Sequence, residues 1–155
     1  MINVGDKAPD FALKNQNNED RSLSAFEGEK NVVLLFFPFA FSSVCTEELC
    51  TMRDNMKIYD DLNAEILGIS VDSFFTLGEF KKAQNLNFDL LSDFNKEVSE
   101  SYGVLYDEFF GNKGVSKRSA YVIDKKGTVR YAWVSEDAGV QPSYNDIKVT
   151  LDEIN

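Results

Sequence analysis

The stretch that most constrains the fold is Asn31–Phe37, an apolar run that stops abruptly at Pro38. A continuous apolar run of this length favours a central strand of a sheet that is covered on both faces. Proline has no backbone N–H and cannot extend the strand ladder. The sequence therefore predicts a buried strand that ends at Pro38 and is followed by a change of structure.

A helix is predicted after this break, capped by Ser42 or Ser43 and running to about Asp60. The apolar side chains that would face the core recur at helical spacing: Leu49, Met52, Met56 and Tyr59. Cys45 lies where the helix would begin. A thiol there faces unpaired backbone N–H groups and the positive end of the helix dipole, and both favour a thiolate. Cys45 is therefore the candidate nucleophile.

The rest of the chain alternates between strand and helix patterns. Strands are predicted over residues 10–14, 21–23, 64–71, 88–93, 119–123 and 128–135. Shorter helices are predicted over residues 76–83, 96–102 and 144–153, with a loop at 104–115. This order implies an α/β fold, and 155 residues suit one domain over 1–155. Cys45 would then follow the carboxyl end of a strand, where open α/β sheets carry their sites.

The amino-acid composition excludes several kinds of active site and binding partner. The chain has no histidine, which removes the commonest general base and the commonest zinc ligand. Cys45 and Cys50 alone are too few ligands for zinc, so we expect no metal site. We expect no cofactor either. A net charge of −10 argues against nucleic acid or an anionic membrane as a partner. Closely spaced cysteines without a signal-peptide pattern predict a reducing, cytoplasmic location.

Three stretches resemble the peroxiredoxin family. Pro38-x-x-x-Ser42-x-x-Cys45 is similar to the family's active-site signature. Residues 4–11 are similar to its usual N-terminus, and Arg118–Asp124 to the strand that carries its second active-site arginine. The resemblance implies a thioredoxin-like α/β/α sandwich with a central mixed sheet and an N-terminal hairpin extension. It also implies a thiol peroxidase that reduces hydrogen peroxide and organic hydroperoxides.

The residues fit such chemistry. The Cys45 thiolate would attack a peroxide oxygen and become a sulfenic acid. With no histidine, Arg118 is the candidate cation, and the Ser42 hydroxyl could reach both the thiolate and the peroxide. The N–H groups of Val44 and Cys45 could hold the developing charge, while Pro38 shields the site from water. Plainer alternatives are a helix cap for Ser42 and a surface cation for Arg118.

Two further residues on the predicted helix have two interpretations each. Glu48 matches the position where the family has a residue that orients the arginine, but it could be a surface acid near the helix N-terminus. Cys50 could resolve the sulfenic acid as a disulfide, or it could pack in the core. On an intact helix the Cys45 and Cys50 Cα atoms are ~8–9 Å apart, too far for a disulfide, so resolution needs local unwinding.

The resemblance does not decide the role of Cys50. Cys45-Thr-x-Glu-x-Cys50 is similar to the bacterioferritin-comigratory (peroxiredoxin Q) branch, whereas residues 37–42 are similar to the alkyl hydroperoxidase E branch, often treated as one-cysteine. A thiol peroxidase of this family would be recycled by thioredoxin, glutaredoxin or a low-molecular-weight thiol. Other candidates are a one-cysteine peroxidase, a disulfide oxidoreductase and a redox-switched binding or chaperone protein. Disulfide oxidoreductase chemistry favours the spacing Cys-x-x-Cys, which this chain lacks.

Aromatic pairs are predicted to form an apolar rim around the mouth of the site. The pairs are Phe39/Phe41, Phe74/Phe75 and Phe109/Phe110. Such a rim could receive an alkyl hydroperoxide, with Phe39 and Phe41 binding substrate beside Val44, or it could receive the second subunit of a homodimer.

Overall fold

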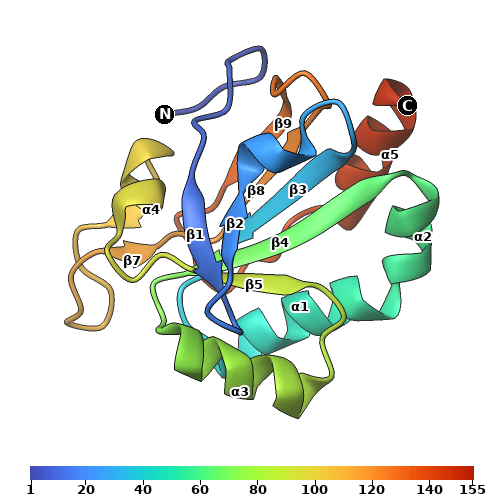
Figure 1. Cartoon of the computed structure of the whole chain (residues 1–155). Helices are drawn as coiled ribbons and strands as arrows, with labels where there is room; N and C mark the ends of the chain where they lie inside the picture. Colours follow the sequence, from blue (N-terminus) through green and yellow to red (C-terminus); the bar gives the residue numbers. More distant parts are fainter.

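The computed structural model describes residues 1–155 and has one large sheet and one small one (Figure 1). The strands are β1 (Ala12–Asn15), β2 (Asp20–Ser22), β3 (Asn31–Phe36), β4 (Ala64–Ser70), β5 (Asp89–Ser92), β6 (Leu105–Tyr106), β7 (Val115–Ser116), β8 (Ser119–Ile123) and β9 (Val129–Val134). The helices are α1 (Ser43–Asp54), α2 (Met56–Asp61), α3 (Phe74–Gln84), α4 (Glu97–Ser101) and α5 (Tyr144–Ile154), with a 3-10 turn η1 (Leu23–Phe26).

The main sheet is mixed, with seven strands in the order β2-β1-β5-β4-β3-β8-β9. Strands β3, β4 and β5 are parallel, whereas β8 pairs antiparallel with β3 on its other side. The chain thus leaves β3 toward β4 and β5 and later returns to the opposite edge of β3. A ligand site is expected beyond the carboxyl end of a strand at such a switch in order, and α1 begins there.

Helices cover both faces of this sheet. Val33, Leu35 and Phe37 join a core cluster that includes residues of α1, α2, α3 and α5. The alternate residues Val32 and Leu34 join a second cluster with residues of η1, α4 and the N-terminal segment. Because side chains of a strand alternate between faces, β3 contributes to both cores. The predicted α/β/α sandwich, its mixed sheet and its β1–β2 hairpin extension are confirmed.

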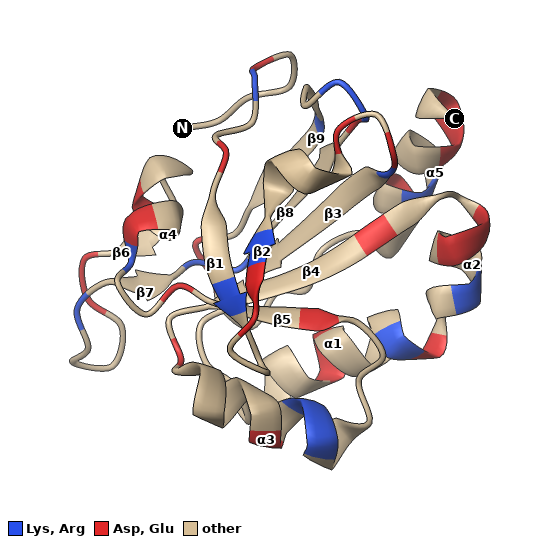
Figure 2. Ribbon diagram, in the orientation of Figure 1, with Lys and Arg blue, Asp and Glu red and all other residues tan.

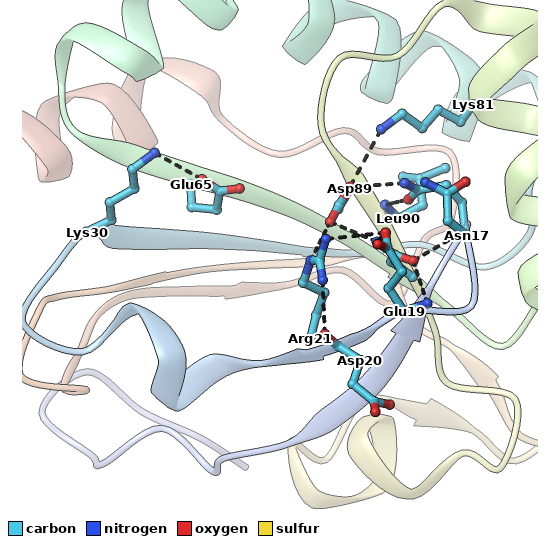
Figure 3. A network of polar contacts seen from close by, with 11 residues as sticks. Asn17, Glu19, Asp20, Arg21, Lys30, Glu65, Lys81, Asp89 and Leu90 are labelled. Atoms are coloured by element: carbon cyan, nitrogen blue, oxygen red, sulfur yellow. Dashed lines mark hydrogen bonds and ion pairs between the residues drawn. The ribbon is translucent and has the colours of Figure 1, made fainter.

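The hairpin is attached to the sheet mainly around Asp89 (Figure 3). Only two register pairs join β1 to β5. The Asp89 carboxylate accepts from Asn15 Nδ2 at 3.2 Å, from Gln16 Nε2 at 3.0 Å and from Arg21 Nε at 3.0 Å. Lys81 Nζ of α3 lies 3.6 Å away. Despite partial burial, these hydrogen bonds and the two cations lower the pKa of Asp89.

Three predicted elements differ from the structure. The helix predicted to reach Asp60 is interrupted at Asn55, whose backbone is not helical and whose side chain donates to Thr51 O. The loop predicted over residues 104–115 contains the short β6–β7 ribbon. The helix predicted from Thr76 begins two residues earlier, because the Ser73 hydroxyl accepts from Thr76 N and caps it.

The molecule's charges are dispersed. Figure 2 shows Asp and Glu spread over several helices and strands, with Lys and Arg scattered among them. No helix is both long and apolar enough to cross a bilayer.

Candidate active site

Cys45 is the third residue of α1, and its side chain is completely buried. The turn into this helix is strained, because Phe41 has a φ of 70°, unusual for a residue with a bulky side chain. The Phe41 ring packs on Phe80 with centroids 5.0 Å apart, which helps to hold this turn. The first turn of a helix leaves backbone N–H groups unpaired, and Cys45 belongs to this turn.

Arg118 joins the two acidic side chains of the site. Its Nη2 donates to Cys45 Sγ at 3.0 Å and its Nη1 donates to Glu48 Oε1 at 2.8 Å. Arg118 directly precedes β8, whose Ser119 pairs with Phe36 at the end of β3. Antiparallel pairing therefore delivers the guanidinium to the start of α1. Arg118 is almost completely buried, so the surface-cation alternative is wrong.

Glu48 lies one helical turn after Cys45 and is fully buried. The surface-acid alternative is therefore wrong, and Glu48 lies beyond the first turn of α1. Its Oε2 has no hydrogen-bond partner. Burial raises the pKa of Glu48 from 4.5 to about 7, although the charge and hydrogen bond of Arg118 act in the opposite direction. The structure thus has a carboxyl group that can change charge near neutral pH.

Ser42 occupies the N-cap position, but its side chain makes no capping hydrogen bond. The predicted side-chain cap is therefore wrong. Its Oγ donates instead to Phe39 O at 2.9 Å. The Ser42 backbone carbonyl accepts from Thr46 N at 2.9 Å and from the Thr46 hydroxyl at 2.8 Å. Ser42 is exposed and lines the cavity described below.

A cavity of about 340 Å³ opens beside the start of α1. It is lined by Pro38, Phe39, Ser42, Ser43, Val44, Phe109, Phe110, Arg118, Ala138 and Gly139. Most of the predicted site residues are thus gathered here or just beneath, with Arg118 linking Cys45 to the cavity. The lining is predominantly apolar in composition, with the guanidinium as its charged group.

The aromatic rim is smaller than predicted. Phe109 packs against Phe39 with ring centroids 6.1 Å apart, and both line the cavity. Phe41 does not line it and is half exposed. Phe74 and Phe75 lie in α3 and not in a loop, and they border a separate cavity of about 370 Å³.

Other residues of the site have no signal in the sequence. Ala138 accepts from Arg118 Nε at 3.1 Å through its backbone carbonyl, a role that any residue type can play. Gln141 donates to Glu47 Oε2 at 3.2 Å and accepts from the Tyr144 hydroxyl. These contacts tie the segment before α5, and α5 itself, to the beginning of α1.

Cys50 lies on another side of the same helix. It is half-buried, and its thiol donates to Gln84 Oε1 of α3 at 3.6 Å. Both cysteines are free and α1 is continuous from Ser43 to Asp54. Five residues along a helix correspond to ~140° around its axis, so the two thiols face different neighbours.

Comparison with known proteins now identifies the family. The model of the AhpC/TSA family matches residues 4–132. The chain belongs to this family. Alkyl hydroperoxide reductase E of Mycobacterium tuberculosis is 36% identical over 143 residues, covering 91% of each chain. Peroxiredoxin Q from the chloroplast of Triticum aestivum is 39% identical over 132 residues, which are 85% of this chain and 59% of the relative.

Solved structures agree with this assignment. The crystal structure of peroxidoxin BcpB from M. tuberculosis has a TM-score of 0.89 and 30% identity, covering 100% of this chain and 99% of that one. Reduced 2-Cys peroxiredoxin of Plasmodium vivax has a TM-score of 0.86 and 33% identity, covering 97% and 95%. The predicted peroxiredoxin family and thioredoxin-like fold are confirmed, and the protein is a thiol peroxidase of the peroxiredoxin type.

Proposed function

We propose that this peroxiredoxin reduces hydrogen peroxide and organic hydroperoxides through a sulfenic acid on Cys45. The observation that carries the proposal is Arg118, which lines an apolar cavity and whose two Nη groups donate to Cys45 Sγ and Glu48 Oε1. Arginine stays charged and presents donors in a planar fork, which suits a buried thiolate and a polarised peroxide together. The name of the mycobacterial relative, alkyl hydroperoxide reductase E, points to the same substrate class.

In the proposed step the Cys45 thiolate attacks the nearer peroxide oxygen. The S–O bond forms as the O–O bond breaks, so the sulfur is oxidised by two electrons and the peroxide is reduced. The leaving oxygen takes up one proton and departs as water or an alcohol. Arg118 and the unpaired N–H groups at the start of α1 stabilise the negative charge as it moves from sulfur to oxygen. The apolar lining of Phe39, Val44 and Phe109 is suited to the carbon chain of an alkyl hydroperoxide.

Substitution of Cys45 tests this proposal. With dithiothreitol as reductant, Cys45→Ser should abolish peroxide consumption, whereas Cys50→Ser should still form the sulfenic acid at nearly the wild-type rate. The rate is measurable by stopped flow if the lone Trp133 reports the change. Peroxide consumption that survives in Cys45→Ser would refute the assignment.

We further propose that Cys50 resolves the sulfenic acid by forming a disulfide with Cys45, and that thioredoxin, glutaredoxin or a low-molecular-weight thiol then recycles the enzyme. The step requires the first turns of α1 to unwind. This opening must break the Arg118 contacts to Cys45 and Glu48 and the weak Cys50–Gln84 contact. Formation of the disulfide releases one water and changes no charge on Cys50 if it enters as a thiol.

Mass spectrometry after one equivalent of peroxide distinguishes the two forms. A loss of two daltons with both thiols consumed supports a Cys45–Cys50 disulfide. A stable sulfenic acid with Cys50 still free would support the one-cysteine alternative. Cys50→Ser is the matched control, because it should give a sulfenic acid and no intramolecular disulfide.

The remaining parts of the proposal concern assembly and location. The exposed rings of Phe41, Phe75, Phe94 and Phe110 support a homodimer, because aromatic side chains are enriched in the buried part of subunit interfaces. Sedimentation at high concentration that detects monomer alone would contradict the homodimer.

Two free cysteines in one short helix support a reducing compartment such as the cytoplasm.

A further inference from the structure

The group formed by Cys45, Glu48 and Arg118 contains one cation and two acids. All three side chains are essentially inaccessible to water. Arg118 donates to both acids from its two Nη atoms, so one positive charge serves two groups that can each become negative. If both acids were ionised, the buried group would carry a net charge of −1, and an uncompensated buried charge is costly.

No neighbouring element supplies a second cation. Arg118 itself precedes β8, and Cys45 lies on the same helix as Glu48. From α5, Tyr144 is near enough to Glu48 to interact with its charge, and it also interacts with Tyr59 of α2. Burial raises the pKa of both phenols, so they are neutral at physiological pH. The charge balance of the site therefore depends on the two acids alone.

Glu48 is poorly equipped to remain ionised beside a thiolate. An ionised carboxylate can accept several hydrogen bonds, but Glu48 Oε2 has no partner. A negative charge on the sulfur, held by the same guanidinium, would oppose ionisation of Glu48 further. The direction in which burial moves the pKa of Glu48, upward to about 7, agrees with this geometry.

We infer that Glu48 holds a proton while Cys45 is a thiolate and releases it when Cys45 becomes a sulfenic acid. The inference rests on the proposed peroxidase function and adds a role for Glu48 beyond orienting the arginine. The peroxide step removes the negative charge from sulfur, so Arg118 becomes free to balance an ionised Glu48. Glu48 thus keeps the buried group close to neutral both before and after the reaction.

The stoichiometry balances without an additional reactant. Thiolate and peroxide give sulfenic acid and the leaving oxygen anion, which needs one proton to form water or an alcohol. Glu48 releases one proton in the same event. The net uptake of protons from solution is therefore smaller than the single proton that a thiolate alone would require.

Proton uptake measured with a pH indicator in weakly buffered solution tests this inference. The Cys50→Ser protein, which stops at the sulfenic acid, is mixed with one equivalent of hydrogen peroxide at pH 7. We expect uptake of about half a proton or less for each Cys45 oxidised, because a group with a pKa of about 7 is about half ionised once the thiolate charge is gone. Adding Glu48→Gln should raise the uptake to nearly one, and equal uptake in the two proteins would overturn the inference.

Glu47→Gln is the matched control, since Glu47 is the adjacent acid but is exposed. It should leave the proton uptake of the Cys50→Ser protein unchanged. A purely structural role of Glu48 would alter the oxidation rate but not the number of protons, because the amide oxygen that Glu48→Gln introduces can still accept from Arg118.

Infrared difference spectroscopy provides a second readout that does not depend on the stability of Glu48→Gln. At pH 7, oxidation of the Cys50→Ser protein should weaken the carbonyl stretch of a protonated carboxylic acid by about half, because Glu48 is then about half ionised, and an unchanged band would overturn the inference. If peroxide leaves Cys45 reduced, the proposed function fails separately. The same band is then followed during alkylation of Cys45 by iodoacetamide, which also removes the thiolate charge and should weaken the band to the same extent.

Discussion

The protein has two clusters in which a carboxylate meets cations, and they have opposite electrostatic properties. Asp89 lies at the hairpin, partly exposed, with amide donors and two cations around it (Figure 3). Glu48 lies in α1, one turn after Cys45, and is fully buried with one hydrogen bond to a shared guanidinium. The pKa of Asp89 is lowered, whereas burial raises the pKa of Glu48 to about 7.

The difference shows why one carboxyl group stabilises the fold while another can change its charge during a reaction. The donors around Asp89 outweigh the cost of partial burial, so it stays ionised and joins β1, β2, β5 and α3. Around Glu48 burial outweighs the single cation, so its charge depends on pH and on the state of Cys45. The depth of burial and the number of hydrogen-bond donors around the carboxylate, and not the presence of an ion pair, separate the two roles.

The largest effect is expected for Arg118→Met, which should slow oxidation of Cys45 by roughly 10²- to 10³-fold because the charge-assisted donors to the reacting sulfur are lost. Arg118→Lys should be intermediate, since one ammonium cannot reproduce the fork to both Cys45 and Glu48. Stopped-flow mixing with hydrogen peroxide measures the rate. Arg130→Met, at an exposed position of β9 paired with Asp124, is the control and should react at the wild-type rate.

The pH dependence of stability should differ in sign between the two clusters. The folded-state pKa of Glu48 lies above its ordinary value of 4.5, so its contribution to stability is full below pH 4.5 and is lost as pH rises through about 7. The pKa of Asp89 is lowered, so its contribution is present above its ordinary value of 3.8 and is lost as pH falls through the folded-state pKa.

Glu48→Gln should therefore remove a decline in stability of up to about 3 kcal/mol between pH 4.5 and 7. Urea unfolding followed by tryptophan fluorescence at several pH values measures it. A wild-type protein whose stability rises over this interval, with the rise unchanged in Glu48→Gln, would contradict the raised pKa.

A smaller effect is expected at the hairpin. Asp89→Asn should destabilise the protein by about 1–2 kcal/mol at neutral pH, because the ion pairs with Arg21 and Lys81 lose their negative partner and one accepting oxygen becomes an amide NH2 group. Hydrogen exchange should show the loss mainly in β1 and β2, with the reactivity of Cys45 unchanged. A large change in peroxide rate would mean that the two clusters are coupled through the sheet.

Local pattern was sufficient to predict much of the molecule. The apolar run Asn31–Phe37 predicted the central strand, Pro38 its end, and the helical spacing after Ser42 the start of α1 with Cys45 in its first turn. These features depend on a residue and its near neighbours in sequence. The resemblance added Arg118, which no local pattern singles out from the other cations of its loop.

Tertiary contacts determine which ionisable groups of the site are buried and which charges lie next to them. Arg118 reaches Cys45 across 73 residues because β8 pairs antiparallel with β3, and its Nε is held by a backbone carbonyl that no side chain identifies. Whether Glu48 is a surface acid or a buried one depends on which side of α1 faces the sheet. Residue types and spacing thus determined where the thiol would lie, whereas packing determined how many charges surround it, because burial and donor count depend on neighbours that are distant in the sequence.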